Sequence, residues 1–123
     1  MNKYAIEVVL RERDFAVTEE VLTASAPRAW TEVDMAEVLR EILGAIDRAK
    51  NPDSAGTRHI ALRGFSWIVE PAEGGVVIAV EIPMGAAVAG PFDADQQQLD
   101  ALITRTLERQ PTLAGVPTSP TIH

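Results

Sequence analysis

Two glycines, Gly85 and Gly90, have the spacing of the glycines in a phosphate-binding P-loop. In such a loop a Lys and then a Ser or Thr follow the second glycine, because the Lys places positive charge on the phosphates. Pro91 and Phe92 occupy these two positions in this chain. The segment therefore lacks the charge that nucleotide binding requires, and we predict no P-loop.

Ser66 lies in half of a nucleophile elbow, within the segment Gly64–Ile68. The second glycine of the elbow is missing, and the alternation of the segment places Ser66 in the middle of a strand. A nucleophile needs the sharp turn from strand to helix that exposes its hydroxyl. We interpret Ser66 as a polar residue on the less apolar face of a strand.

The chain has few residues that could bind a metal ion and none that could supply a thiol. The chain has no cysteine, which excludes disulfides, thiolate nucleophiles, iron–sulfur clusters and Cys-based zinc sites. Its two histidines, His59 and His123, are far apart, and no HxH or HExxH motif is present. We expect no metal and no cofactor, and the lack of cysteine fits the reducing cytoplasm.

Two carboxylates, Glu70 and Glu81, fall on the more polar face of a predicted hairpin. They are more than one residue pair apart, whereas an acid–base couple needs close carboxyl groups and an apolar setting that raises one pKa. The remaining carboxylates of interest, Glu37, Glu41 and Asp47, lie on the solvated side of a predicted helix, where Glu37 is placed to pair with Arg40. We expect none of these to be catalytic.

Two features have both a structural and a binding interpretation. Trp67 is a core residue if it faces the helices, or part of a binding platform with Phe65 if that face is uncovered. The segment Met84–Pro91 is a continuation of a strand with Val88 in the core, or a mobile loop at the mouth of a cleft. Together with the charged residues Arg63 and Glu81, these two features give the candidate binding residues. They are Arg63, Trp67, Glu81, Met84, Gly85 and Gly90.

The elements that would position these residues begin with two hairpins. Residues 3–10 alternate, and the alternation resumes after a turn at 11–14, which predicts that Val8 pairs with Val17 and Leu10 with Phe15. The stretch 18–25 fits a strand or a short helix.

A second hairpin is predicted from residues 58–70 and 76–83. The apolar residues on either side of its turn share one face, whether the turn has two residues or four. The four-residue turn is favoured because it leaves Pro71 at the end of its strand. The shared face carries Phe65, Trp67, Val69, Val76, Ile78, Val80 and Ile82.

Two helices follow the hairpins, each after an aromatic residue. Thr31-x-x-Asp34 follows Trp30 and Asp93-x-x-Gln96 follows Phe92, and both resemble capping boxes. Asn51-Pro52 and Pro111 predict the two helix ends. Gly44 inside the first helix suggests a close approach of its backbone to the sheet. The apolar stripes are Met35, Val38, Leu39, Ile42, Leu43 and Ile46 in the first helix, and Leu99, Leu102, Ile103 and Leu107 in the second.

The two hairpin-plus-helix units have turns and caps offset by about sixty residues, which suggests a duplicated ββα unit, although few residues are identical. The predicted fold is α+β: a four-stranded, mainly antiparallel sheet with two helices on one face, in the order ββαββα. The length of 123 residues suffices for one domain, which we assign to 1–110. Residues 111–123, with three prolines, are expected to form an extended or flexible tail.

Charge and hydrophobicity limit the partners. The net charge of −7 disfavours nucleic acid, and neither a signal peptide nor a membrane span is predicted. The acidic surface suits a basic protein partner, although acidity also serves solubility. The predicted open face of the sheet is too apolar for a monomer, so we expect a homodimer through that face or an edge strand. Its apolar residues are Ile60, Leu62, Ile68, Val77 and Ala79.

Three functions fit these observations. The favoured hypothesis is a small, acidic, non-catalytic protein-interaction module of the adaptor, chaperone or immunity type. The first alternative is a small-molecule-binding domain with a pocket between helices and sheet, gated by Met84–Pro91. The second alternative is a metal-independent enzyme that uses carboxylates or Arg63.

Overall fold

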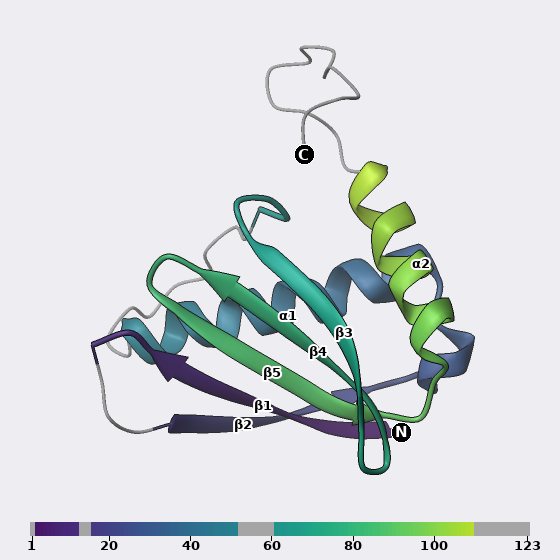
Figure 1. Ribbon diagram of the computed structural model, residues 1–123, viewed down its shortest axis with the longest axis horizontal. Coiled ribbons are helices and arrows are strands. Elements are labelled where there is room, and N and C mark those ends of the chain that lie inside the picture. The colour runs from purple at the N-terminus through teal and green to yellow at the C-terminus, as the bar shows by residue number, and fades with distance from the viewer. Residues whose placement is uncertain (1, 13–15, 52–60, 110–123) are drawn as a thin grey trace.

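The computed structural model describes residues 2–12, 16–51 and 61–109, which contain five strands and two α-helices in the order ββαβββα (Figure 1). The strands form one antiparallel sheet in the order β2-β1-β5-β4-β3. The predicted α+β class is confirmed, whereas the four-stranded sheet and the ββαββα order are wrong because a fifth strand was missed. The elements are β1 (Asn2–Leu10), β2 (Ala16–Thr23), the short 3₁₀ helix η1 (Pro27–Ala29), α1 (Glu32–Lys50), β3 (Ser66–Ala72), β4 (Gly75–Ile82), β5 (Gly85–Phe92) and α2 (Gln96–Glu108).

Both helices cover the same face of the sheet, as predicted. Helix α1 packs against β1 and β5, and α2 packs against β3 and α1. Figure 1 looks onto the opposite, open face, with α1 crossing behind the strands. The inward-facing side chains of β1, β3, β4 and β5 join the apolar stripes of both helices in one core. The apolar residues that alternate along the strands and those that recur every 3.6 residues along the helices therefore form one core between the two layers.

The first hairpin has the predicted register. Val8 lies opposite Val17, and residues 16–23 are strand, which decides between the two interpretations of this stretch. The predicted partner of Leu10, Phe15, lies outside the described residues. The β1 side chains that alternate inward are all buried, namely Tyr4, Ile6, Val8 and Leu10.

The second hairpin is shorter than predicted but keeps the favoured register. Pro71 pairs with Val76, as the favoured turn requires, but Ala72 and Gly75 also pair. The turn therefore has two residues, Glu73-Gly74, and Pro71 lies within the ladder, so the predicted four-residue turn that leaves Pro71 at the strand end is wrong. Strand β3 begins at Ser66 and not at residue 58. Leu62, predicted on the open face, packs against the core instead, while Ile60, predicted beside it, lies outside the described residues.

Residues 84–91 were expected to continue the preceding strand or to form a mobile loop. They form instead a separate strand, β5, after a turn at Pro83-Met84, and this strand is the central one, between β1 and β4. The inward-facing residues Ala87 and Ala89 are small and buried, which lets α1 lie close to the sheet. Val88, predicted in the core, faces the other way and is 40% exposed. The gate at the mouth of a cleft is therefore wrong for this segment. Its small residues reflect close packing of backbone and helix.

The N-terminus of α1 agrees with the prediction, whereas that of α2 does not. At α1 the Asp34 carboxylate accepts a hydrogen bond from the Thr31 backbone N–H (2.9 Å), and the Thr31 hydroxyl accepts one from the Asp34 N–H (3.3 Å). At α2 the N-cap is Asp95 and not Asp93, because Phe92 still belongs to β5 and a turn must follow it. Asp93 instead pairs with Arg28 at 3.0 Å.

Because β5 lies within the second unit of the suggested repeat, the two units differ in structure. Phe92 ends a strand, whereas Trp30 follows η1. Gly44 has a different explanation from the one predicted. A side chain there would meet the Arg48 guanidinium at 3.1 Å, so the glycine leaves room for Arg48 to reach Glu19 on β2. The close approach is between a helix and its own side chain, and not between helix and sheet.

Candidate functional site

The open face of the sheet carries a continuous apolar band. In one row across the strands Val88, Ala79 and Ile68 are successive neighbours, and in the next row Val9 is opposite Ala86. Three of these side chains are substantially exposed, namely Val9 (49%), Ile68 (52%) and Val88 (40%). We call these five residues the apolar band.

Carboxylates border the apolar band. Glu7 is opposite Val88, Glu81 is opposite Ala86, and Glu70 follows on β3 two residues after Ile68. Within the part of the chain that the structure describes, no ion pair is found for any of the three, whereas Glu20 nearby is paired with Lys3 at 3.7 Å. The open face therefore combines exposed apolar area with uncompensated negative charge.

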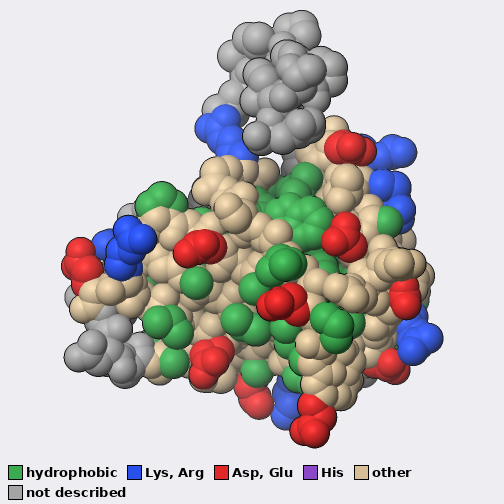
Figure 2. Space-filling view, viewed as in Figure 1, with side chains coloured by type: hydrophobic (Ala, Val, Ile, Leu, Met, Phe, Trp, Pro, Cys, Tyr) green, Lys and Arg blue, Asp and Glu red, His purple; other side chains and the backbone are tan. Residues whose placement is uncertain are grey.

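Figure 2 shows this face in space-filling form. Hydrophobic and acidic side chains are interspersed over the strands, and the Lys and Arg side chains of the described residues appear towards the margins of the view. Single exposed apolar side chains are normal on a protein surface, so the informative feature is that these residues are contiguous across neighbouring strands.

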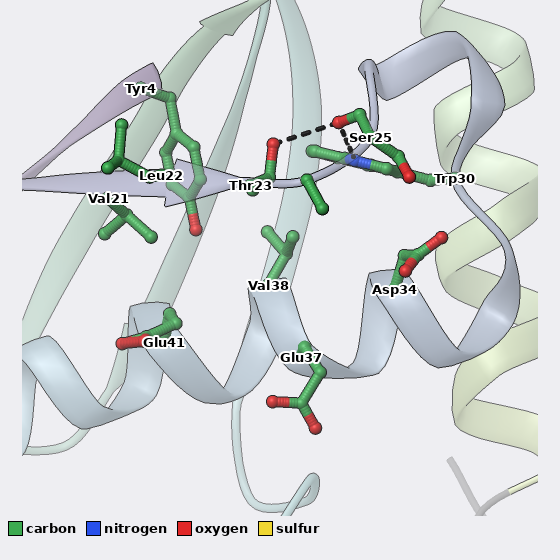
Figure 3. Close-up of a pocket in the computed structure, with 11 residues that line it drawn as sticks. Tyr4, Val21, Leu22, Thr23, Ser25, Trp30, Asp34, Glu37, Val38 and Glu41 are labelled. Carbon is green, nitrogen blue, oxygen red and sulfur yellow. Dashed lines mark hydrogen bonds between the residues drawn. The ribbon is translucent and has the colours of Figure 1, made fainter. Parts of the chain in front are cut away.

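A separate hollow of about 260 Å³ lies on the other side of the sheet, between β2 and α1 (Figure 3). Its apolar walls come from Val21 on the edge strand, Val38 on α1 and Trp30 ahead of the helix. Its acidic residues are Asp34, Glu37 and Glu41, which recur along α1 at helical spacing. None of the described residues that line the hollow is Lys or Arg.

Tyr4 forms the inner wall of the hollow, and its hydroxyl points towards α1 (Figure 3). The residue is only 6% exposed, and its hydroxyl oxygen is buried without a hydrogen-bond partner among the described residues. Burial, and secondarily the negative charge of Glu41, raise the pKa of the Tyr4 phenol well above its usual value of 10.0. The phenol is therefore held in its neutral form.

Aromatic packing fixes the position of this hydroxyl. The Phe92 ring lies between two others, with its centroid 4.9 Å from that of Tyr4 and 5.2 Å from that of Trp30. The Trp30 indole N–H donates to the Ser25 carbonyl at 3.0 Å, so the indole offers the hollow an apolar surface and not a donor. Tyr4 is therefore buried, held in place by aromatic packing, and left with a hydroxyl that has no partner among the described residues.

Neighbouring arginines compensate two of the α1 carboxylates. Arg40 pairs with Glu37 at 3.0 Å, as predicted, and in Figure 3 the Glu37 carboxylate points away from Tyr4. Arg48 binds Glu19 of β2 with two hydrogen bonds (2.7 and 3.1 Å) and lies 3.5 Å from Glu41. The hydrogen bonds to Glu19 are the main reason that the pKa of Arg48 is raised. Arg48 thereby joins the edge strand to α1 beside the hollow.

The candidate residues predicted from the sequence do not come together in one site. Trp67 faces the helices and packs against the core, which confirms its structural interpretation. Arg63 is exposed ahead of β3, and Glu81 lies on the open face. Met84, in the turn between β4 and β5, lines a second hollow with Leu10, Arg11, Glu12, Lys50 and Pro83.

The two predicted glycines have packing roles. A Cβ atom at Gly85 would lie 2.7 Å from the Val9 carbonyl oxygen. Gly90 has a φ of +133°, a conformation that residues with a side chain rarely adopt. It lies near the register shift between β4 and β5. Of the six candidates, only Glu81 therefore belongs to the acidic border of the open face.

Sequence reasoning missed the residues that define the hollow. Alternation correctly places Tyr4 in the core, but it carries no information on whether the hydroxyl finds a partner. Glu41 was assigned to a solvated helix face, because the position of β2 beside that face was not predicted. The signal that was available is the polar tip of Tyr4 on an otherwise aliphatic strand face.

Two searches among the described residues bear on other kinds of site. They contain no group of three or more His, Asp or Glu residues placed to hold a metal ion. None of their helices is long and apolar enough to cross a membrane. Comparison of the chain with protein-family models, with curated proteins and with solved structures finds no match.

Proposed function

We propose that this protein is a non-catalytic interaction module whose open sheet face binds a basic, amphipathic segment of another protein. The observation that carries the proposal is the apolar band bordered by the unpaired carboxylates Glu7, Glu70 and Glu81. Apolar area supplies the attraction on contact, and the carboxylates select the charge of the partner.

The band suits an extended segment that presents apolar and basic side chains on one and the same face, because alternate residues of a strand point to opposite faces. Val88, Ala79 and Ile68 follow one another across three strands, so neighbouring side chains are separated by the strand spacing of roughly 4.8 Å. A partner whose Leu or Val residues contact the band would place its Lys or Arg residues near Glu7 and Glu81. Charge complementarity would also speed encounter at low salt.

A second copy of the chain is the competing occupant, because a homodimer was expected from the apolar open face. Face-to-face packing of two copies would bring the acidic borders of both sheets together, which is unfavourable without compensating cations. Nucleic acid is disfavoured for the same reason of charge. A basic protein segment relieves both the exposed apolar area and the unpaired charge.

The test is the binding of a synthetic extended peptide that carries Leu at its centre and Lys towards both ends on the same face, measured by calorimetry at low and high salt. We expect saturable binding that weakens as salt is raised. The variant Glu81→Lys should weaken binding about tenfold, because it reverses a charge next to the band. Glu108→Lys, at the end of α2, makes the same change in net charge away from this face and should leave affinity within about twofold.

Equal effects of the two variants would show that only net charge matters and would overturn the proposed site. Light scattering of the unliganded protein distinguishes the competing occupant. A stable dimer that Ile68→Ser converts to monomer would assign the open face to self-association and would likewise overturn the proposal.

A further inference from the structure

The hollow between β2 and α1 has no role in the interaction proposed above, since it lies on the helix side of the sheet. We propose that it is a binding site for a small organic cation, a primary amine with a compact apolar body, held between the Tyr4 hydroxyl and the Glu41 carboxylate. This inference is independent of the proposed protein interaction.

The Tyr4 hydroxyl is the first reason. A buried hydroxyl without a partner is uncommon in folded proteins, and its lost hydrogen bonds weigh against the unliganded state. A neutral phenol offers lone pairs to an N–H donor. An ammonium group has three such donors, so it can bond the phenol oxygen and a carboxylate at once. The lining side chains must move apart for this contact, because the oxygen is shielded from solvent in the unliganded structure.

The charge of the lining residues is the second reason. Asp34, Glu37 and Glu41 line the hollow, and its lining includes no cationic side chain from the part of the chain that the structure describes. Glu41 is the carboxylate whose charge acts on Tyr4, and its contact with Arg48 is long, at 3.5 Å. Arg40 and Arg48 offset only part of this charge, so an anion is still repelled, whereas an ammonium group adds a contact to Glu41 that is closer than the 3.5 Å contact of Arg48.

The walls define the rest of the ligand. Val21 and Val38 contribute aliphatic surface, and Trp30 contributes an aromatic surface whose N–H is already bonded. Aromatic faces attract cations as well as apolar groups. At about 260 Å³ the hollow suits an amine with a single small ring or a short branched chain.

The competing explanation is that a water molecule satisfies Tyr4 and that nothing else binds. The full-length, ¹⁵N-labelled protein should therefore be titrated with benzylammonium and, as a matched neutral probe, benzyl alcohol. We expect saturable shifts with benzylammonium at residues 21–25, at the Trp30 indole and along 34–41, and affinity at least about tenfold weaker for benzyl alcohol. Similar affinity for the two probes would overturn the assignment to a cation.

Variants separate the two hydrogen-bonding groups. Tyr4→Phe keeps the ring and Glu41→Gln keeps the shape, and each should weaken benzylammonium binding about tenfold. Glu108→Gln removes one carboxylate at the end of α2, away from the hollow, and should leave the affinity unchanged. No saturable shift in the native protein, unchanged affinity in both hollow variants, or a long-lived water on Tyr4 that persists at high benzylammonium would each overturn the proposal.

Discussion

The two faces of the sheet carry isoleucines in similar positions but in different surroundings. Ile78 on β4 faces the helices and is completely buried, whereas Ile68 on the neighbouring strand faces outward and is 52% exposed. The covered face gains stability by removing such side chains from water. The open face does not, so its apolar band adds little to folding and remains free for binding.

This comparison predicts the largest effect for a pair of matched truncations. Ile78→Ala should reduce the free energy of unfolding by about 3 kcal/mol, because it leaves a cavity in the core. Ile68→Ala should cost less than about 1 kcal/mol, because the side chain is already half exposed. Urea denaturation of both variants measures the difference. Similar losses would mean that the open face is covered in the native protein.

Among the described residues, the covered face has one buried side-chain polar atom without a hydrogen-bond partner, the Tyr4 hydroxyl, and high pH should reveal its effect on stability. The pKa of the Tyr4 phenol is raised on folding, so the stability it contributes is complete below pH 10 and is lost as pH rises above the unfolded value of 10.0. The loss should be about 1.4 kcal/mol per pH unit in that range. Tyr4 is the only tyrosine, so tyrosinate absorbance reports it alone.

Tyr4→Phe provides the control for the pH experiment, since it should remove that part of the pH dependence. Other groups that titrate at high pH are common to both proteins and cancel in the comparison. Identical alkaline unfolding curves for the native chain and Tyr4→Phe would contradict the burial of a neutral phenol.

At neutral pH the same variant should stabilise the protein by about 1 kcal/mol, because a buried hydroxyl without a partner is removed while the ring is kept. Thermal and urea unfolding measure the change. A loss of stability would instead mean that the hydroxyl has a bound partner such as water. If Tyr4→Phe both gains stability and binds the amine more weakly, the Tyr4 hydroxyl serves binding at some cost in stability.

The smallest effect concerns the edge of the sheet. Arg48→Ala should cost about 1 kcal/mol, because two hydrogen bonds between α1 and Glu19 of β2 are lost in a half-exposed setting. Arg40→Ala, which removes only the pair with Glu37 on the same helix, should cost about 0.3 kcal/mol. Hydrogen exchange in β2 should increase for Arg48→Ala alone. Equal exchange in both variants would contradict the role of Arg48 in holding the edge strand.

Local patterns predicted some elements well and others poorly. The inward faces of β1 and β4 and the stripe of α1 follow from strict periodicity, and the α1 cap follows from Thr31 and Asp34. Strand β5 has an Ala- and Gly-rich sequence without a polar alternation, so its central place could not be inferred with certainty. The misplaced cap at Asp93 is a consequence, because the end of β5 decides where α2 begins.

The candidate sites show the same division. Glu81 was correctly placed on the polar face of its hairpin, but its grouping with Glu7 and the apolar band depends on β5 lying between β1 and β4. The hollow depends on α1 crossing beside β2, so Tyr4 and Glu41 could not be linked from their positions in the chain.

Residue order alone determined which side chains lie inside and which outside, because the repeat of a strand or helix is a local property of the backbone. It also determined that the protein has a negative net charge and no thiol chemistry. Only the tertiary structure decided which strands are neighbours, which carboxylates gather around exposed apolar groups, and that a buried phenol lacks a partner. These depend on contacts between distant segments, whose geometry is set by packing of the whole domain.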